Sequence, residues 1–151
     1  MSEEVVIAGD HSSPELKRRL SRYLEQRGYQ VDDLGVYNSD SVNYAEFAEK
    51  ACLKYLEGGY AFGVLVCGTG IGISISANKV RGIRCALPQN VFAAGMTKKH
   101  NDANFIAFGA RIEYSESPEE ILGAYLDAAF EGGRHAIRVE YMMGLEQLKP
   151  N

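Results

Sequence analysis

A cysteine followed by alternating glycines is the part of this sequence best suited to chemistry. The run Cys67-Gly68-Thr69-Gly70-Ile71-Gly72 lies between a strand-like segment and a segment of small residues typical of a helix. Glycines at such a junction let the backbone turn tightly and leave its N–H groups free to bind an anion or a developing oxyanion. A thiol beside those amides and a helix N-terminus favours its thiolate form, which acts as a base or a nucleophile. Cys67 is therefore the first candidate for a catalytic residue.

The spacing of these glycines does not match the common nucleotide-binding motifs. A dinucleotide fingerprint that starts at Gly68 requires glycine where Ile73 stands, and one that starts at Gly70 requires glycine where Ile75 stands. The Lys-Ser or Lys-Thr pair of a P-loop does not follow either. A tight turn without a ligand is the plain alternative, and the interleaved cysteine and threonine weigh against it.

The cysteine count argues against structural roles for these residues. Cys52, Cys67 and Cys85 are an odd number, and they show no CxxC or Cys/His ligand spacing. A disulfide framework and a structural zinc site are therefore not expected. Most free cysteines are small buried apolar residues, and we predict this for Cys52 and Cys85, which lie inside a predicted helix and a predicted strand.

Two further positions combine histidine with polar neighbours at the ends of elements. His100 and Asn101 fall at a predicted helix end just before a strand, and Asp10 and His11 follow the first predicted strand. A histidine at a helix end can also do no more than interact with the helix dipole, so both interpretations stand for these histidines. His135 is expected to be a surface residue or an auxiliary phosphate contact.

Three arginines could converge on a phosphate group. Arg134 and Arg138 are four residues apart, so a helix would project both from one face, and Arg111 could join them. The alternative is solvated ion pairing, of Arg134 with Glu131 and of Arg138 with Asp127.

Short apolar runs alternate five times with segments of helical period. The predicted strands are about 5–8, 30–34, 62–66, 83–87 and 104–108, and the predicted helices are 14–27, 44–56, 74–79, 91–99, 118–130 and 134–148. Ser13-Pro14 and Ser117-Pro118 are typical helix starts, and Gly28 a typical helix end.

This alternation predicts a single α/β domain over residues 1–151. We expect a three-layer, Rossmann-like fold with a five-stranded parallel sheet, helices on both faces and an extra C-terminal helix. Ligands of such sheets bind outside the carboxyl ends of the strands, near a switch in strand order. Asp10-His11 and the loop that begins at Cys67 are both predicted at that edge.

Charge and hydropathy exclude several classes of protein. The net charge is −4, whereas a nucleic-acid-binding module would be basic. No apolar run approaches the roughly 20 residues of a membrane helix. The acidic start Met1-Ser2-Glu3-Glu4 does not resemble a secretory signal. Because the three cysteines do not suggest a disulfide framework, a reducing cytoplasmic location is expected.

Seven motifs, in order over nearly the whole chain, resemble one enzyme family, ribose-5-phosphate isomerase type B, which belongs with the galactose-6-phosphate isomerase subunits. They are Gly9-Asp10-His11, Cys67 to Ser74, Ala77-Asn78-Lys79, Gly82-Ile83-Arg84, His100 to Asn104, Phe108 to Arg111 and Glu131 to His135. Cys67 is typical of the members of that family that use a cysteine base. His100 separates the chain from the galactose-6-phosphate isomerase subunits, which lack a histidine at this position.

The resemblance implies a metal-free and cofactor-free aldose–ketose isomerisation. Cys67 would move the proton between C1 and C2, Thr69 would assist, and the amides of Gly68–Gly72 would hold the enediolate oxygens. His100 would open the furanose ring, with Asp10 nearby.

The resemblance also implies a set of substrate contacts and a partner. The implied substrate-binding residues are Asp10, His11, Tyr44, Gly68, Thr69, Gly70, Ile71, Gly72, Ser74 and Asn101, and the implied phosphate ligands are His11, Arg111, Arg134 and Arg138. The family forms homodimers or tetramers with active sites at the subunit interface.

One segment departs from the family pattern and leaves the substrate open. Asn43-Tyr44-Ala45 stands where the family usually has Asp-Tyr-Pro. Ribose 5-phosphate is the first expectation, and a six-carbon phosphate such as allose 6-phosphate is the second. A non-catalytic phosphate- or nucleotide-binding module is an alternative from another class. A redox-active thiol is disfavoured because Cys67 has no partner cysteine nearby in sequence.

Overall fold

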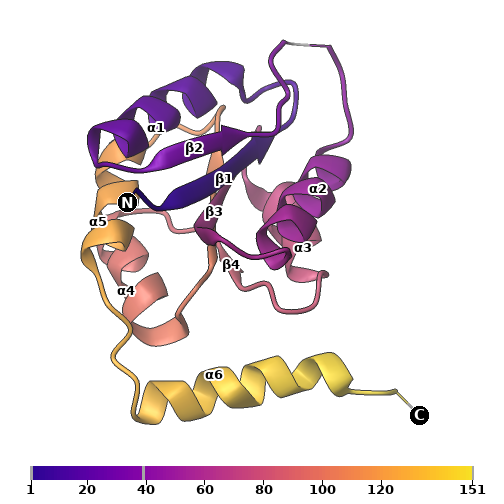
Figure 1. Ribbon diagram of the computed structural model, residues 1–151, viewed down its shortest axis with the longest axis vertical. Coiled ribbons are helices and arrows are strands. Elements are labelled where there is room, and N and C mark those ends of the chain that lie inside the picture. The colour runs from indigo at the N-terminus through magenta and orange to yellow at the C-terminus, as the bar shows by residue number, and fades with distance from the viewer. Residues whose placement is uncertain (1, 39, 151) are drawn as a thin grey trace.

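Five parallel strands form the centre of the molecule. The computed structural model describes residues 2–38 and 40–150, and its strands lie in the order β2-β1-β3-β5-β4 (Figure 1). Their bounds are β1 Glu4–Gly9, β2 Gln30–Asp33, β3 Tyr60–Cys67, β4 Cys85–Ala86 and β5 Phe105–Gly109. Each pair of neighbouring strands is parallel. The predicted Rossmann-like α/β fold is confirmed.

Helices cover both faces of this sheet, and one helix extends beyond it. The α-helices in the described segments are α1 Pro14–Gln26, α2 Tyr44–Leu56, α3 Ile71–Asn78, α4 Val91–Asn101, α5 Pro118–Asp127 and α6 Arg134–Gly144. One face carries α1, α4 and α5, and the other carries α2 and α3 (Figure 1). The last helix, α6, leaves the body and runs past the end of α4 (Figure 1). No helix in the described segments has the length and apolarity to span a membrane.

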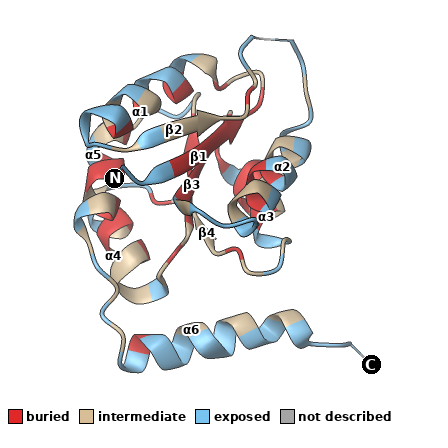
Figure 2. Cartoon of the chain, in the orientation of Figure 1, coloured by how far each residue is buried: buried red, intermediate tan, exposed pale blue. Residues whose placement is uncertain are grey.

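The central strands are buried on both sides, as a parallel sheet requires. Residues 5–8 of β1, 64–66 of β3 and 105–108 of β5 have no exposed surface. One apolar cluster packs between these strands and α1, α4 and α5, and a second packs between them and α2 and α3. Figure 2 shows this burial concentrated in the strands and in the helix faces that meet them, whereas α6 is largely exposed. The core therefore holds the sheet rigidly, and α6 lies outside it.

The strand order places a switch point between β1 and β3. The chain leaves β1 through α1 on one face of the sheet and leaves β3 through α3 on the opposite face. The two connections therefore diverge and open a crevice at the carboxyl ends of these strands. Asp10 follows β1 and Cys67 ends β3, so both border this crevice.

One predicted boundary was wrong beside this crevice. The sequence suggested a helix from Ser74, but α3 begins at Ile71, directly after Gly70. Gly70 adopts the left-handed conformation with φ of 79°, which glycine reaches without strain, and this turns the chain into the helix three residues early. The first amides of α3 therefore belong to the glycine run itself.

Other predicted boundaries differ at the ends of elements. The fourth strand is two residues long instead of five, because the backbone N–H of Arg84 is bonded to the Asn104 side chain and not to a strand. The fourth helix extends two residues further, to Asn101. The fifth helix ends at Asp127 because Ala128 is extended. Pro14 and Pro118 begin their helices as predicted.

Gly63 offers a test of the packing between the two central strands. A Cβ at this position would overlap the ring of Phe105, which is fully buried on β5. We expect Gly63→Ala to lower the free energy of unfolding by about 1–3 kcal/mol because the ring cannot move aside in a packed core. Urea denaturation measures this loss. Gly144→Ala is the matched control, since Gly144 is helical with open space around its Cβ position, and an equal loss in both variants would contradict the packing argument.

Candidate active site

The thiol of Cys67 lies at the N-terminus of α3. The N–H of Gly70 donates to the Cys67 sulfur over 3.2 Å, and the N–H of Ile71 donates to the Thr69 hydroxyl over 3.2 Å. These bonds curl the loop around the sulfur. Cys67 is 4% exposed, whereas Thr69 beside it is exposed. Ser74, the last residue of the motif, is buried and donates its hydroxyl to the Ile71 carbonyl.

The segment that departs from the family pattern begins α2 and contacts the same loop. The Asn43 side chain accepts the N–H of Ala45 over 2.9 Å and caps the helix, a role in which asparagine and aspartate are equally effective. The Tyr44 ring, on the first residue of α2, lies so close to Gly72 that a Cβ there would overlap it. Replacement of the usual acid by Asn43 therefore preserves the start of α2 and the position of Tyr44 against the glycine run.

Asp10 and His11 lie beside Cys67 across the switch point. The N–H of Asp10 donates to the Val66 carbonyl over 3.1 Å, which joins the loop after β1 to the end of β3. The Asp10 carboxylate is nearly buried and accepts the N–H and the hydroxyl of Ser12. His11 accepts the Val42 N–H at Nδ1 over 3.2 Å, so its ring also holds the segment that leads to α2.

Arg111 reaches the loop from the end of β5. The backbone N–H of Arg111 donates to the Gly68 carbonyl over 2.9 Å, and the backbone N–H of Ala110 donates to the Cys67 carbonyl over 2.8 Å. The guanidinium group lies over Gly68, with Nη1 3.4 Å from the position of a Cβ. One edge of the sheet therefore holds a first group of site residues, which we call the cysteine group: Cys67, the loop 68–74, Asp10, His11, Tyr44 and Arg111.

His100 belongs to a second cluster, between the ends of α4 and α6. Its ring stacks on that of His135 with centroids 4.0 Å apart and planes 7° apart. The Nε2 atoms of His100 and His135 lie 3.5 Å and 3.4 Å from the same Glu131 carboxylate oxygen. The expectation that His135 is a surface residue was wrong: it is 6% exposed, with its ring stacked on that of His100 at the end of α4. Arg134 and Arg138 lie on the same helix, and we call these five residues with Asn101 the histidine group.

Burial and neighbouring charge act together on His135. Desolvation lowers the pKa of its imidazole, and the neighbouring His100, Arg134 and Arg138 lower it further against an opposing effect of Glu131. The lowered pKa favours the neutral form of this imidazole. In a neutral imidazole only one ring nitrogen carries a proton. That nitrogen donates a hydrogen bond, and the other can accept a proton or a hydrogen bond.

The alternative ion pairs expected for the arginines are not found in the described part of the chain. Glu131 faces His100 and His135 rather than Arg134. Asp127 pairs with Arg27 over 2.6 Å rather than with Arg138. The guanidinium groups of α6 are exposed and lack a carboxylate partner among residues 2–38 and 40–150. They therefore remain suited to an anion.

The cysteine and histidine groups lie at opposite ends of the sheet. Cys67 pairs with Gly109 at the carboxyl end of β5, whereas Asn101 precedes the amino end, where Phe105 pairs with Gly63. These two pairs are four residues apart along the strands, a distance of about 13 Å. A cavity of about 350 Å³ borders Thr69 and Ile71, and a separate one of about 610 Å³ is bordered by Asn101. One chain therefore does not bring Cys67 and His100 together.

Comparison with known proteins shows the family of the chain. The family model described as Ribose/Galactose Isomerase matches residues 5–142. The chain belongs to this family. It is 38% identical to the Ribose-5-phosphate isomerase B of Escherichia coli (strain K12), over 96% of this chain and 97% of that protein. It is 41% identical to the D-erythrulose-4-phosphate isomerase of Pectobacterium atrosepticum (strain SCRI 1043), over 90% of each chain.

A solved structure extends the match to three dimensions. The Clostridium thermocellum Ribose-5-Phosphate Isomerase B has a TM-score of 0.91 to this chain, with 41% identity over 95% of this chain and 97% of that one. The family resemblance expected from the sequence motifs is therefore confirmed for the ribose/galactose isomerase family. Sequence reasoning named Glu131 only within a motif and as a partner of Arg134. It missed the contact of Glu131 with both histidines and the burial of His135, because no local motif indicates which side chains pack together in the fold.

The three thiols of this family member should differ in reactivity. Burial raises the pKa of the Cys52 thiol to about 12, and burial with Cys52 nearby raises that of Cys85. A raised pKa means less thiolate at pH 8, so Cys52 should react with iodoacetamide on the order of a thousandfold more slowly than in the unfolded chain. Cys67, which lies at a helix N-terminus, should react first. Mass spectrometry of native protein, with urea-unfolded protein as control, measures the order, and early modification of Cys52 or Cys85 would contradict it.

Proposed function

We propose that this chain is an aldose–ketose isomerase that interconverts ribose 5-phosphate and ribulose 5-phosphate. The observation that carries the proposal is Cys67 at the N-terminus of α3, inside the switch-point crevice of a ribose/galactose isomerase family member. The Cys67 thiolate removes the proton from C2 of the open-chain aldose and returns it to C1. The N–H groups of the glycine run stabilise the enediolate oxygens between these two steps.

Ring opening and phosphate binding are assigned to the remaining residues. His100 moves the proton between the anomeric hydroxyl and the ring oxygen, and Asn101 binds sugar hydroxyls. Arg134 and Arg138 bind the phosphate with Arg111. The C2 proton moves to C1 and the O2 hydroxyl proton moves to O1, so atoms and electrons balance without a metal or a redox cofactor.

The opposite positions of the two groups support an active site built by two copies of the chain. If the histidine group of one copy docks against the cysteine group of another, a homodimer has two complete sites. A closed two-fold arrangement gives each copy the same role. The arginines of α6, which is almost outside the core, would then complete the phosphate pocket of the neighbour.

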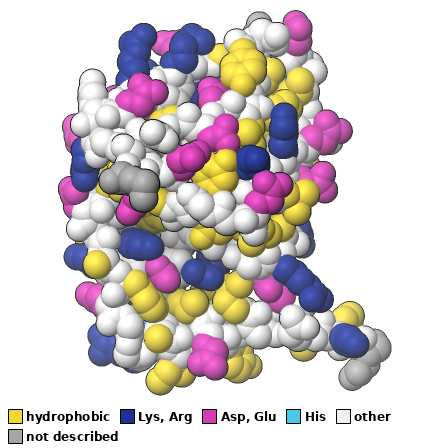
Figure 3. Space-filling view, in the orientation of Figure 1, with side chains coloured by type: hydrophobic (Ala, Val, Ile, Leu, Met, Phe, Trp, Pro, Cys, Tyr) yellow, Lys and Arg dark blue, Asp and Glu magenta, His cyan; other side chains and the backbone are white. Residues whose placement is uncertain are grey.

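Exposed apolar side chains support such an association. Ile71 and Ile75 lie one turn apart on α3 and are each more than half exposed, and Phe92 of α4 is 74% exposed. On α6, Ile137 and Tyr141 are also exposed. Figure 3 shows hydrophobic side chains gathered on the lower part of the molecule, over and around α6. Apolar surface of this extent on a small protein is typical of an interface.

The preferred sugar rests on a narrower observation. Asn43 caps α2 and Tyr44 packs against Gly72. The start of α2 is therefore preserved beside the glycine run, which gives no reason to prefer a six-carbon substrate. Ribose 5-phosphate is therefore proposed first, and a six-carbon aldose phosphate such as allose 6-phosphate second, because Ala45 stands where the family usually has proline. Catalytic efficiency on a panel of aldose phosphates separates these.

Removal of the proposed base should abolish turnover. We expect Cys67→Ala to lower kcat for ribose 5-phosphate by at least a thousandfold, since it removes the proposed base for the C2 proton. The Cys85→Ala variant, which removes a thiol from the same protein away from the loop, should keep kcat within about twofold. Conversion to ribulose 5-phosphate is measured without added metal.

Two outcomes would overturn parts of this proposal. Equal rates for wild type and Cys67→Ala would exclude Cys67 as the base. Binding of sugar phosphates by wild type without turnover of any of them would favour the alternative, a non-catalytic phosphate- or nucleotide-binding module.

The shared site has its own test in subunit complementation. Cys67→Ala and His100→Ala should each be nearly inactive alone. When they are unfolded together in equal amounts and refolded, half of the dimers pair one with the other, and one of the two sites in each such dimer is intact. We therefore expect about a quarter of wild-type activity.

The control pairs two variants from the same group. A mixture of His100→Ala and Arg134→Ala should recover no activity beyond that of its components, because each mixed site then carries a defect. No recovery in the Cys67→Ala and His100→Ala mixture, with refolding of wild type shown to be complete, would mean that both residues act within one chain.

A further inference from the structure

The last turn of α4 carries two residues of the histidine group and has a specific anchoring requirement. His100 and Asn101 occupy its final positions, and Asp102 ends the helix in the left-handed conformation with φ of 43°. The last carbonyl groups of a helix lack partners inside the helix, so this turn frays unless other groups bind them. The position of His100 therefore depends on what binds the carbonyls that follow it.

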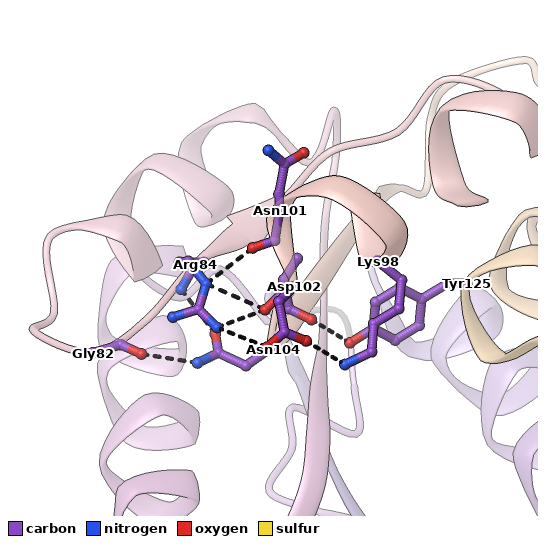
Figure 4. Close-up of polar contacts among 8 residues, drawn as sticks. Gly82, Arg84, Lys98, Asn101, Asp102, Asn104 and Tyr125 are labelled. Carbon is purple, nitrogen blue, oxygen red and sulfur yellow. Dashed lines mark hydrogen bonds and ion pairs between the residues drawn. The ribbon is translucent and has the colours of Figure 1, made fainter. Parts of the chain in front are cut away.

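A single side chain, that of Arg84, provides these bonds. Its Nε donates to the Asn101 carbonyl over 3.1 Å and to the Asp102 carbonyl over 3.2 Å, and its Nη2 donates to the Asp102 carbonyl over 2.6 Å (Figure 4). The side chain is 18% exposed. A guanidinium group matches this pair of carbonyls because its N–H groups form a rigid fork, and its charge is favourable at a helix C-terminus.

Asn104 fixes the backbone from which Arg84 projects. Its Oδ1 accepts the Arg84 N–H over 2.8 Å, and its Nδ2 donates to the Gly82 carbonyl over 2.8 Å (Figure 4). The loop before β4 and the loop before β5 are thereby joined. Arg84 thus reaches α4 from a fixed point, so its guanidinium group is already oriented towards the helix end.

Two further contacts fix the residues after His100. Lys98 donates to the Asp102 carboxylate over 2.8 Å, and the Tyr125 hydroxyl of α5 donates to the Ala103 carbonyl (Figure 4). The helix end is therefore bound from α4 itself, from α5 and from the loop before β4. Of these contacts, only those of Arg84 reach the carbonyl of Asn101, the residue directly after His100.

We propose that Arg84 is a positioning residue for the isomerisation, which holds His100 and Asn101 in place by binding the end of α4. The inference rests on the proposed function. It also accounts for two sequence motifs that the chemistry itself does not use, Gly82-Ile83-Arg84 and the Asn104 that ends the run from His100. Arg84 acts through His100 and Asn101, and takes no part in proton transfer.

The test combines hydrogen exchange with a double-mutant cycle. In Arg84→Ala, amides of residues 99–103 should exchange at least tenfold faster than in wild type, and kcat for ribose 5-phosphate should fall at least tenfold. In a His100→Ala background, adding Arg84→Ala should cost less than it does in the wild-type background, because one of the two residues that it positions is already gone. Arg84→Lys keeps one cationic donor and should recover part of the loss.

The matched control is Arg81→Ala, from the same loop, since Arg81 is exposed and makes no side-chain hydrogen bond within the described segments. It should leave exchange and kcat unchanged. Unchanged exchange over residues 99–103 in Arg84→Ala would overturn the proposal whatever the activity, and so would equal losses from Arg84→Ala in both backgrounds. Absence of any turnover by wild type would instead count against the proposed function, while the exchange measurement still reports on Arg84.

Discussion

Backbone hydrogen bonds at the carboxyl end of β3 are the constraint on which the cysteine group depends. On one side of this strand, the N–H of Asp10 donates to the Val66 carbonyl. On the other side, the N–H groups of Ala110 and Arg111 donate to the carbonyls of Cys67 and Gly68. Three loops that are distant in sequence are thereby joined around Cys67. Because the strands beneath are fully buried, none of these loops can move without disturbing the core. The geometry around the thiol is therefore a property of the sheet.

A different set of contacts holds the histidine group in place. It lies at the amino end of β5, where the end of α4, the start of α6 and the connecting segment meet. The N–H of Glu131 bonds to the Lys99 carbonyl, which holds this segment against α4, and the stacked rings complete the contact. A parallel sheet separates its two ends by the length of its strands. If both ends serve one reaction, as we propose, two chains have to associate to complete the site.

Much of this arrangement could be predicted from local patterns. Proline at Pro14 and Pro118 indicates helix starts because its fixed φ suits the first helical position, and both helices begin there. The short strand at Cys85 and the early start of α3 at Ile71 could not be predicted in the same way. Strand length at a sheet edge depends on whether the neighbouring loop takes the hydrogen bonds, and Asn104 takes one of them here.

The sequence by itself determined the parallel α/β fold, the place of Cys67 at the end of a strand, and the family, because apolar periodicity and ordered motifs are local properties of the chain. Only the tertiary structure decided that Cys67 and His100 lie at opposite ends of the sheet, that His135 is covered by a stacked ring, and that Arg84 binds the end of α4. These are contacts between residues far apart in sequence. They follow from strand order and from the burial of the apolar faces, which bring such residues together only when the whole chain packs.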